Sequence, residues 1–512
     1  IFFRVPKCDV PSKTKPVLSG ARRPMQRPSR WLAHGRQPWL LPGATGRSRH
    51  LLRALSTTVE PLGTDFMAVL RRHAERQHDA VLYRMISLKG LAQPPTEVTY
   101  AALELRARRV AAFLAARGLR PGDRALLFYG DGDALAFMGA FFGCLAAGVV
   151  AVPAAPPDLV RPGRTLLRLQ AIVKDCAPAA VLTTAQLLQN KARARDLAAL
   201  PADLEWLAVE DDADLPAARA PAVPDGAAVA MLQYTSGSTG APKGIRLTHR
   251  NLVENQRAVQ AAFGNTARTH CASWLPLHHD MGLIGGALHP LYLGASSTFI
   301  PAMMFLKRPV VWLQAIAQYG IELSGGPNFA FDLCTRKVRD EDLQGLDLGS
   351  WKVAFVGAEP IHPHTLRDFA ARFAPCGLSP EALYPCYGLA ESTLFVTGGD
   401  RHTAARRLPL SIAGLHKGVA EPPRDGADAR EYVSCGHGHG HADVRIVDPV
   451  TARACPEGRV GEVWVRGGSV ADGYWRLPDD AFTATLAGGG DGDGDGDGPY
   501  LRTGDLGVMQ AG

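Results

Sequence analysis

Segments typical of helices and strands alternate along this chain from Val98 onward, and this alternation limits the possible folds more than any other feature. A helical period runs through Tyr100–Arg117, a Pro-Gly-Asp turn follows, and the apolar run Ala125–Tyr129 has the length of a strand. Such alternation predicts a mostly parallel sheet covered by helices. The pattern continues with a helix at Leu135–Ala147, strands at Val149–Val152 and Ala179–Leu182, a helix at Ala185–Ala199 and a strand at Ala227–Tyr234.

Two further regions follow, and their sequence patterns differ from that of the first. Strand-like runs at Ser297–Ile300 and Val353–Val356 lie between amphipathic helical segments, which predicts a second α/β layer. The remainder is rich in turns, with short β runs at Val444–Val447 and Gly461–Val465. We therefore expect an α/β fold of two layered α/β subdomains and a small β-barrel-like subdomain. The expected boundaries are residues 57–228, 229–399 and 400–512.

Basic residues are concentrated in residues 1–56, which show no sustained helical or strand period. This segment holds 12 Lys and Arg against the single acid Asp9, a charge of +11, so the rest of the chain carries −4 of the total of +7. A nucleic-acid reader needs its basic patch on the folded part, so we exclude that class. We expect residues 1–56 to be a disordered basic tail or a mis-assigned start, because the chain begins at Ile1; an organelle transit peptide is the alternative.

Two features bear on the compartment of the protein. Ala134–Pro157 contains no charged residue and is long enough to cross a membrane. Gly148 interrupts it, and Pro153 and Pro156 close it, which is the pattern of a helix followed by a buried parallel strand, so we expect no membrane span. The nine cysteines include no CxxC pair, and such scattered thiols are typical of a reduced, cytoplasmic protein.

A run rich in hydroxyls and glycines follows the strand that ends at Tyr234. Such a loop lets backbone N–H groups converge on an anion without Cβ clashes, and its lysine adds a positive charge. It is not a Walker A loop, which ends in Gly-Lys-Ser/Thr. A flexible linker is the alternative, but linkers seldom carry Pro-Lys-Gly directly before a helix start such as Thr248–Asn251. The predicted phosphate loop is Thr235-Ser236-Gly237-Ser238-Thr239-Gly240-Ala241-Pro242-Lys243-Gly244.

This run resembles the phosphate loop of the adenylate-forming superfamily, which comprises acyl-CoA synthetases, peptide-synthetase adenylation domains and luciferases. Two further matches occur in the family's order: Tyr387-Gly388-Leu389-Ala390-Glu391 is similar to its Tyr-Gly-x-x-Glu motif, and Tyr500-Leu501-Arg502-Thr503-Gly504-Asp505 to its Tyr-x-Arg-Thr-Gly-Asp motif. The resemblance covers about residues 59–512 and implies the large N-terminal domain of that fold. The family continues into a lid domain with a catalytic lysine. We expect that lid to be absent and this chain alone to form adenylate poorly.

The resemblance implies that these motifs bind ATP and Mg²⁺. Tyr387 offers a face on which adenine can stack, with Gly388 beside it, and Asp505 accepts hydrogen bonds from the ribose hydroxyls. Glu391 supplies a hard oxygen for Mg²⁺, and Lys243 neutralises charge on the triphosphate. Considered alone, Tyr387 could be a core tyrosine and Glu391 a solvated surface residue. The resemblance also implies backbone contacts to adenine from Gly357, Ala358 and Glu359.

Two further segments, Trp274–Leu283 and Gly325–Ala330, are similar to parts of fatty acyl-AMP ligases. These enzymes activate fatty acids as adenylates and pass them to an acyl carrier protein. The resemblance implies that both line the acyl site and that His279 orients the substrate carboxylate. A metal site at His278-His279-Asp280 is the alternative, but adjacent histidines on one strand point to opposite faces and cannot readily share an ion. The predicted acyl-site residues are Trp274, His278, Asp280, Met281, Gly282, Gly326, Pro327, Asn328 and Phe329.

Two low-complexity runs contain metal-binding residue types. Cys435, His437, His439 and His441 alternate with glycine, which indicates a flexible loop rather than a functional metal site. The alternating Asp and Gly residues at 491–497 lack the closing Glu of an EF-hand. We expect them to form a disordered, solvated insert.

The resemblance therefore implies a ligase that converts a fatty acid and ATP to acyl-AMP and pyrophosphate, with Lys243, Glu391 and His279 in catalytic roles. The acceptor it implies is an acyl carrier protein, for which fusion to a polyketide or peptide synthase is one arrangement. A fatty acyl-CoA synthetase is an alternative, although fatty acyl-AMP ligases carry an insertion, associated with failure to use coenzyme A, near the long stretch Thr397–Val433. An amino-acid adenylation domain would need a pocket Asp for the α-amino group, and no convincing candidate lies near Trp274. A truncated remnant that binds nucleotide or acyl chain without turnover is the third alternative.

Overall fold

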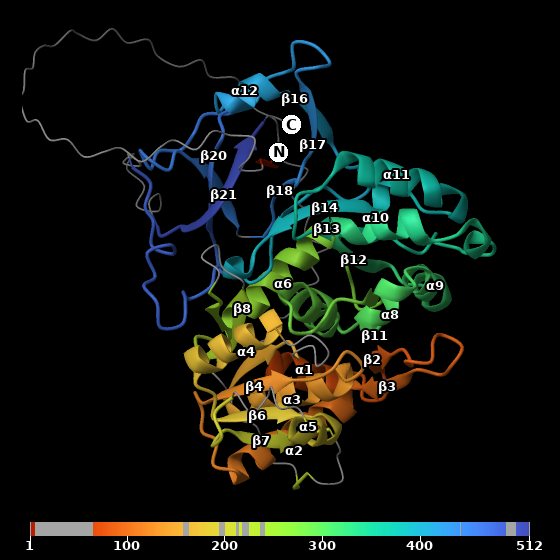
Figure 1. The fold of residues 1–512 in the computed structure, drawn as a ribbon, viewed down its shortest axis with the longest axis vertical. Coiled ribbons are helices and arrows are strands. Elements are labelled where there is room, and N and C mark those ends of the chain that lie inside the picture. Colours follow the sequence, from red (N-terminus) through yellow and green to blue (C-terminus); the bar gives the residue numbers. More distant parts are fainter. Residues whose placement is uncertain are drawn as a thin grey trace, which may run out of the picture. The chain divides into compact units, whose positions relative to one another are not determined.

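Four β-sheets make up the described part of the computed structural model, which covers residues 2–5, 65–156, 163–193, 200–210, 215–217, 225–235, 241–440, 442–487 and 498–510. Two of these sheets are layered with helices, and two are small and antiparallel (Figure 1). The predicted α/β class is therefore confirmed.

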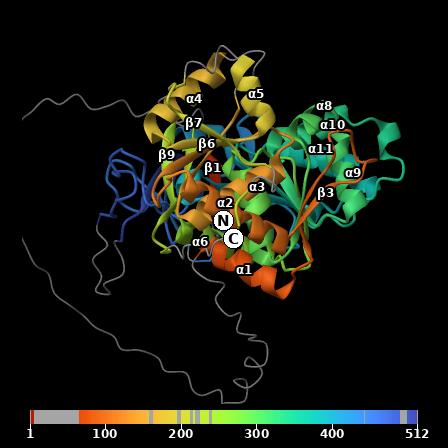
Figure 2. The ribbon, with the colours of Figure 1, turned by 90° about the horizontal axis from the view of Figure 1, so that it is seen from below.

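The first sheet contains six strands and is flanked by four helices. These elements are α2 (Tyr100–Ala116), β4 (Arg124–Phe128), α3 (Ala134–Ala147), β5 (Val150–Ala154), α4 (Gly163–Cys176), β6 (Ala180–Thr183), α5 (Ala185–Arg193), β7 (Glu205–Ala208), β8 (Val229–Thr235) and β9 (Lys243–Thr248). The strand order is β7-β6-β4-β5-β8-β9, parallel except for the antiparallel pair β8 and β9. Figure 2 shows α4 and α5 on one side of this sheet and α2 and α3 on the other. The predicted strands of this region are confirmed to within two residues at each end.

The uncharged segment that could be mistaken for a membrane span forms helix α3 and strand β5, as predicted. Gly139 and Gly143 of α3 face Arg106 and Val110 of α2, where a Cβ would clash with either side chain, so the two helices pack closely. Within the described residues, no helix is both long and apolar enough to cross a membrane.

The second sheet contains nine strands. They are β2 (Val81–Met85), β3 (Thr96–Thr99), β10 (His270–Ser273), β11 (Ser296–Phe299), β12 (Leu323–Pro327), β13 (Val353–Gly357), β14 (Leu383–Gly388), β15 (Phe395–Gly398) and β18 (His437–Gly438). Their order is β18-β15-β14-β13-β12-β10-β11-β2-β3. The strands from β14 to β2 in this order are parallel, and β3, β15 and β18 at the two edges are antiparallel.

The sheets do not divide at the boundaries expected from the sequence. β2 and β3, from the region 57–228, extend the second sheet, whereas β8 and β9, from the region 229–399, complete the first. β18, from the region 400–512, lies at the edge of the second sheet. Long-range strand pairing decides which sheet a strand joins, and local composition carries no record of it.

Helices cover both faces of the nine-stranded sheet. They are α1 (Phe66–Arg76), α6 (His249–Phe263), the π-helix η3 (Met281–Leu288), α7 (His289–Leu293), α8 (Ala302–Lys307), α9 (Val310–Tyr319), α10 (Asn328–Lys337), α11 (Pro363–Phe373) and the 3₁₀ helices η4 (Asp340–Leu343), η5 (Ala374–Cys376), η6 (Pro380–Ala382) and η7 (Ala390–Ser392). Ala354 and Val356 of β13 pack with α9, α10 and α11, whereas Val353 and Phe355 pack with α6. Successive strand side chains point to opposite faces, so α6 lies across the sheet from α10 and α11 (Figure 1).

Helix α6 begins where the sequence predicts it. Thr248 is its N-cap, and its side chain accepts a hydrogen bond from the backbone N–H of Asn251 at 3.1 Å. The Asn251 side chain accepts in return from the Thr248 backbone N–H, which completes a capping box. The predicted helix start directly after the phosphate loop is therefore confirmed.

The third sheet is open. It contains β1 (Phe2–Val5), β19 (Asp443–Val447), β20 (Gly461–Arg466) and β21 (Leu501–Met509), all antiparallel, in the order β1-β21-β20-β19. The described residues thus form no closed barrel here, contrary to the barrel-like expectation. β1 also differs from the disordered tail expected at its position, because Phe and Val favour strands and β21 offers a free edge. The other residues of 1–56 lie outside the described ones.

The long stretch 397–433 contains a small unit of its own. β16 (Arg407–Ser411) and β17 (Ala429–Val433) pair as an antiparallel two-stranded sheet, and α12 (Ile412–His416) follows β16 directly. Leu410, Leu415 and Tyr432 of this unit pack against Val508 of β21. Apolar contacts therefore attach this unit to the third sheet.

Two buried histidines make the stability of the fold sensitive to acid. Burial lowers the pKa of His249 to about 4 and that of His289 to about 3. The unfolded chain protonates its histidines near pH 6.5, so below that pH the unfolded state binds more protons and the free energy of unfolding falls. We expect each histidine to cost about 2 kcal/mol between pH 7 and pH 5. Urea unfolding measured across this range tests the effect.

The matched variant is His289→Asn, which keeps a side-chain donor for Gln256 Oε1, 2.9 Å from His289 Nδ1. This variant should lose the part of the pH dependence of the unfolding free energy that comes from His289 and keep the part that comes from His249. A stability that stays constant from pH 7 to about pH 5, or the same slope in His289→Asn, would contradict this account.

Candidate active site

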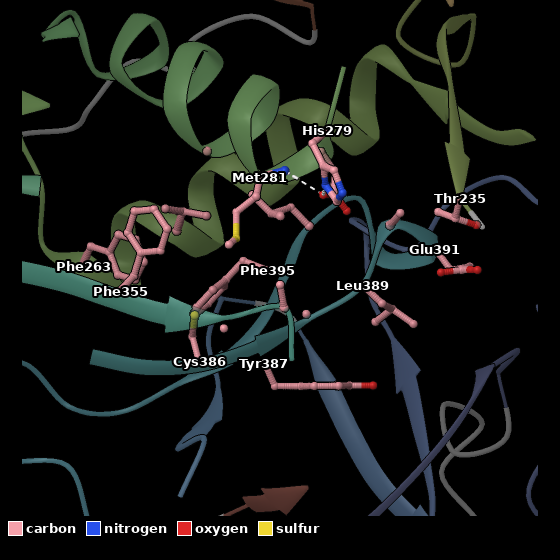
Figure 3. A pocket seen from close by; sticks show the side chains of 18 of the residues that line it. Thr235, Phe263, His279, Met281, Phe355, Cys386, Tyr387, Leu389, Glu391 and Phe395 are labelled. Carbon is pink, nitrogen blue, oxygen red and sulfur yellow. Dashed lines mark hydrogen bonds and ion pairs between the residues drawn. The ribbon is translucent and has the colours of Figure 1, made fainter. Parts of the chain in front are cut away.

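The carboxyl ends of parallel strands meet at a cavity of about 420 Å³. β8 ends at Thr235 and β13 at Gly357, and ligands of open α/β sheets bind beyond such strand ends. Residues of α6 and η3 cover the cavity from the other side. Figure 3 shows Thr235 and Glu391 at one end and the aromatic rings of Phe263 and Phe355 at the other. The cavity thus has a polar end and an apolar end.

Tyr387 and Asp505 lie together at the wall of the cavity. The Tyr387 hydroxyl donates a hydrogen bond to Asp505 Oδ2 at 3.1 Å, although the residues are 118 positions apart in the sequence. Gly388 allows a close approach here, since a Cβ at that position would collide with the Leu394 carbonyl oxygen. Tyr387 was predicted to stack on adenine and Asp505 to bind the ribose, from two separate motifs. The two residues therefore contact each other in the structure.

Glu391 lies at the polar end beside Tyr474, a residue that sequence reasoning missed. Glu391 Oε1 accepts a hydrogen bond from the Tyr474 hydroxyl at 3.0 Å. The Lys243 ammonium lies over the Tyr474 ring, with Nζ 4.9 Å from its centroid. Tyr474 is held in place because its backbone forms a bridge with Ile245 of β9. One tyrosine thus contacts both the predicted metal-binding carboxylate and the predicted triphosphate lysine.

Three carboxylates line the cavity: Asp280, Glu391 and Asp505. Burial raises the pKa of Glu391, and the charges of Asp280 and Asp505 raise it further. A divalent cation would offset this repulsion, and Mg²⁺ takes one or two protein carboxylates with water and phosphate oxygens. Although three carboxylates line the cavity, no three His, Cys, Asp or Glu side chains of the described residues are grouped so that they could hold a metal ion by themselves. The residues therefore fit Mg²⁺ held by Glu391 together with a bound nucleotide.

Glu462 of β20 shapes the local backbone turn at Gly504, within strand β21 and directly before Asp505. Its side-chain oxygens accept hydrogen bonds from the Gly504 backbone N–H at 3.0 Å, from the Arg502 guanidinium at 2.8 Å and from the Trp464 indole at 3.2 Å. Gly504 has φ of 70°, in the left-handed region that favours glycine. Because Asp505 follows directly, this buried carboxylate determines where Asp505 points.

We expect Glu462→Gln to weaken ATP binding about ten-fold, because the amide loses the charge-assisted bonds from Arg502 and Gly504 and releases the turn. Calorimetric titration with ATP measures this. Trp464→Phe is the matched control, since it removes one donor and leaves the carboxylate, and it should change ATP affinity less than about two-fold. Unchanged affinity in a folded Glu462→Gln protein would contradict the positioning role.

The segment His278-His279-Asp280 forms a turn between β10 and η3 rather than the expected strand. Asp280 Oδ1 accepts a hydrogen bond from the Met281 backbone N–H at 2.7 Å and lies 2.9 Å from His279 Nδ1. The bond with Asp280 raises the pKa of His279, whereas burial lowers that of His278 to about 4. His279 and Asp280 line the main cavity and also a neighbouring one of about 200 Å³, where His278 lies. His279 is thus placed to donate a hydrogen bond to an anion at the polar end.

The residues that follow β13 border a third cavity of about 420 Å³ on the side of Tyr387. Ala358 lines both this cavity and the main one, and it has φ of 68°. Glu359 Oε1 accepts a hydrogen bond from the Phe329 backbone N–H at 2.8 Å. The backbone expected to contact adenine therefore lies where the two cavities meet, with Gly357 on the side of the main cavity.

The predicted phosphate loop is described only at its two ends. Thr235 and Lys243 are paired residues of the antiparallel strands β8 and β9. Ser236, Gly237, Ser238, Thr239 and Gly240 lie outside the described residues.

The predicted acyl-site residues fall into two groups. His278, Asp280 and Met281 line the main cavity or its neighbour, and Gly282 packs against the backbone beside Pro276. Trp274 instead lies on the other face of the sheet, where its ring stacks on Phe305 at 4.1 Å between centroids. Strand alternation explains this, because Trp274 continues the face of Ala272, which packs toward α9. Trp274 is therefore a core residue.

The other members of that set form the joint between β12 and α10. A Cβ at Gly326 would come 2.7 Å from the Trp274 ring, and Asn328 bonds to Thr365 and to the His362 backbone N–H. Gly326, Pro327, Asn328 and Phe329 line none of the three cavities described above. Asn328 and Phe329 instead bond to the loop after β13, at His362 and Glu359, so their expected place in the acyl site stays a prediction.

Of the residues at the apolar end of the cavity, sequence reasoning named only Met281. Val259 and Phe263 are four residues apart on α6, a spacing that is equally typical of an ordinary core stripe. The strand residues opposite them are also indistinguishable by pattern from core. The apolar end is lined by Val259, Phe263, Met281, Gly285, Leu323, Phe355, Cys386, Leu394 and Phe395.

The glycine-histidine run lies at the edge strand β18. The rings of His437 and His439 stack with centroids 4.4 Å apart, and His437 Nε2 lies 3.0 Å from Asp400 Oδ1. His439 Nε2 lies 3.1 Å from the Gly398 carbonyl oxygen, so backbone and carboxylate groups take these ring nitrogens. His441 and the predicted acidic insert at 491–497 lie outside the described residues.

Comparisons with known proteins give a consistent result. The family described as AMP-binding enzyme matches residues 70–475. The medium-chain-fatty-acid acyl-carrier-protein ligase JamA of Moorena producens is 40% identical over 424 residues, which are 81% of this chain and 70% of that protein. The long-chain-fatty-acid AMP ligase FadD26 of Mycobacterium marinum is 39% identical over 427 residues, 81% of this chain and 71% of that protein.

Solved structures agree. The crystal structure of a fatty acid AMP ligase from Legionella pneumophila has a TM-score of 0.78 and 35% identity, and the match covers 88% of this chain and 75% of that one. A fatty acyl-adenylate ligase from L. pneumophila, crystallised with acyl adenylate and pyrophosphate, gives a TM-score of 0.78 and 35% identity over 88% of this chain and 76% of that one.

Proposed function

This chain belongs to the family of AMP-binding enzymes, and on that basis we propose that it activates a fatty acid with ATP to give acyl-AMP and pyrophosphate. The acyl group then passes to an acyl carrier protein. One observation carries this proposal: a single cavity joins a polar end with carboxylates to an apolar end without charged residues. Such a cavity suits a substrate with an anionic head and an alkyl tail.

The nucleotide part of the proposal assigns ATP to the polar end. Tyr387 stacks on adenine, Asp505 binds the ribose, and the backbone after β13 borders the base. The support for these roles is the Tyr387–Asp505 hydrogen bond of 3.1 Å and the shared lining of the two cavities around Tyr387. Lys243, at the start of β9, faces the triphosphate.

The chemical step needs no general base, because the attacking carboxylate is already anionic. It attacks the α-phosphorus of ATP, and the bond from that phosphorus to pyrophosphate breaks. The obstacle is to hold two anions together, so catalysis consists of positioning and charge neutralisation. His279, whose pKa the neighbouring Asp280 raises, donates a hydrogen bond that orients the carboxylate. Bound Mg²⁺ would neutralise charge on the phosphate oxygens, and Glu391 would hold it, with Tyr474 fixing its Oε1.

The acceptor and compartment complete the proposal. The chain is similar over most of its length to ligases named for acyl carrier proteins and for AMP, which supports a carrier protein over coenzyme A as the acceptor. We propose a cytoplasmic location, supported by the nine scattered cysteines, which include no CxxC pair.

Fatty-acid-dependent exchange of pyrophosphate into ATP tests the activation step. We expect exchange with fatty acids and none with amino acids, because an alkyl chain would fill the apolar end of the cavity. Exchange that depends on an amino acid and not on any fatty acid would overturn the proposal.

A further inference from the structure

We propose that Phe263 and Phe355 form an end wall that restricts the acyl cavity to medium-chain fatty acids. This inference rests on the proposed function, because it assumes that the alkyl chain occupies the apolar end of the main cavity. Figure 3 shows both rings at the end remote from Thr235 and Glu391. A chain whose carboxylate lies at the polar end therefore points its tail at these two rings.

The end wall is a packed aromatic layer. The rings of Phe263 and Phe355 stack with centroids 6.1 Å apart and an interplanar angle of 11°. Phe263 also meets Tyr384 and Phe395 nearly edge-on, at 5.0 and 5.7 Å. Phe263 is 5% exposed and Tyr384 is 4% exposed, so the layer leaves little free space behind the cavity.

Polar groups lie next to the wall, and two of their hydrogen bonds are formed there, although His289 Nε2 has no partner among the described residues. The Tyr384 hydroxyl donates a hydrogen bond to the Gly399 carbonyl oxygen. His289 is fully buried, lies 6.4 Å from the Phe263 ring and pairs through Nδ1 with Gln256 Oε1 at 2.9 Å. An alkyl tail that passed the wall would separate these groups and leave them without hydrogen bonds, which is unfavourable in a buried site.

The wall predicts how affinity depends on chain length. Each methylene that enters the apolar end should improve binding about four-fold, until the tail meets the rings. The cavity of about 420 Å³ also includes the polar end, so only part of that volume holds the tail. We therefore expect a chain of the length of decanoic acid to be accepted and hexadecanoic acid to require displacement of packed aromatic side chains.

A substitution at Gly285 of η3 should shorten the preferred fatty acid, whereas truncation of the end wall should lengthen it. Gly285 lines the apolar end, and a Cβ built there meets only the flexible end of Leu394, at 3.3 Å from Cδ2. A larger side chain at this position would occupy the space of the tail. Phe263→Ala should thus lengthen the preferred acid, and Gly285→Leu should shorten it.

The experiment measures kcat/KM for acyl-AMP formation by the full-length protein with butanoic, octanoic, decanoic, dodecanoic and hexadecanoic acids. The unchanged protein should use decanoic acid at least about ten-fold better than hexadecanoic acid. Phe263→Ala should raise the hexadecanoic-to-decanoic ratio about ten-fold or more, and Gly285→Leu should move the optimum toward butanoic acid. Phe263→Leu, a milder truncation, serves if Phe263→Ala does not fold.

Phe331→Ala is the matched control. Phe331 is also a fully buried phenylalanine, but it packs on the other face of the sheet against Trp351 and Phe369. This variant should lose stability and keep the chain-length profile. Equal use of hexadecanoic acid by the unchanged protein, or an unchanged ratio in a folded Phe263 variant, would overturn the end wall and leave fatty-acid activation intact. Absence of adenylate with every acid would instead overturn the proposed function.

Discussion

Glu391→Ala is expected to lower the rate of acyl-AMP formation by about two to three orders of magnitude while changing ATP affinity less than about three-fold. The reason is the position of this carboxylate. It lines the polar end of the cavity with Asp280 and Asp505 and would hold the Mg²⁺ that neutralises charge on the phosphate oxygens. Its interaction is strongest in the transition state, whereas adenine and ribose contacts made elsewhere maintain the affinity for ATP.

Single-turnover formation of acyl-AMP and calorimetric ATP binding separate these two quantities. Tyr474→Phe is the matched control, because it removes only the hydrogen bond of 3.0 Å to Glu391 Oε1 and keeps the ring beneath Lys243. It should slow the reaction about ten-fold or less and shift the Mg²⁺ concentration needed for half-maximal rate upward. Losses of similar size in rate and ATP affinity for Glu391→Ala would contradict the role assigned to Glu391.

Asp505→Ala is expected to weaken ATP binding by about one-hundred-fold or more. A carboxylate that accepts hydrogen bonds from both ribose hydroxyls contributes about 1.5–3 kcal/mol for each such bond. Glu462 holds the turn before Asp505, and the Tyr387 hydroxyl donates to Asp505 Oδ2, so the carboxylate is oriented before ATP arrives. The loss should appear mainly in binding, because the ribose contacts change little during the chemical step.

Comparison of ATP with 2′-deoxy-ATP identifies the contact. The unchanged protein should prefer ATP, and Asp505→Ala should bind both nucleotides equally. Tyr387→Phe is the matched control: it removes the hydroxyl that bonds Asp505 and keeps the aromatic face, so ATP affinity should fall only about two- to five-fold. Retention of the preference for ATP in Asp505→Ala would show that another group binds the ribose.

The order of helices and strands in the first sheet was predictable, because each segment carries its own period and its own Gly or Pro boundaries. The sheet to which each strand belongs was less predictable. β2 pairs with β11, far along the chain, and β3 pairs with β2, but no local pattern records the pairing with β11. The helix start at Thr248 was predictable because a capping box is a local arrangement of the side chains of Thr248 and Asn251.

The polar end of the site was largely predictable, since its residues belong to short motifs with a chemical reason for each residue type. Tyr474 escaped prediction because it approaches Glu391 across 83 positions, by a backbone bridge to β9. The apolar end escaped for a different reason. An apolar residue such as Phe263 has the same sequence pattern in a cavity wall as in a core, and only packing distinguishes them. The same ambiguity applies to Trp274, which was expected to line the acyl site and packs in the core cluster with Phe305.

The most direct test of the proposed activity is to follow radiolabelled ATP with decanoic acid and the full-length protein, with and without coenzyme A, and then with a purified acyl carrier protein. We predict labelled acyl-AMP that accumulates, that is indifferent to coenzyme A, and that disappears when the carrier protein becomes acylated. Conversion to acyl-CoA would identify a fatty acyl-CoA synthetase instead. ATP binding without any adenylate would contradict the proposed activity altogether.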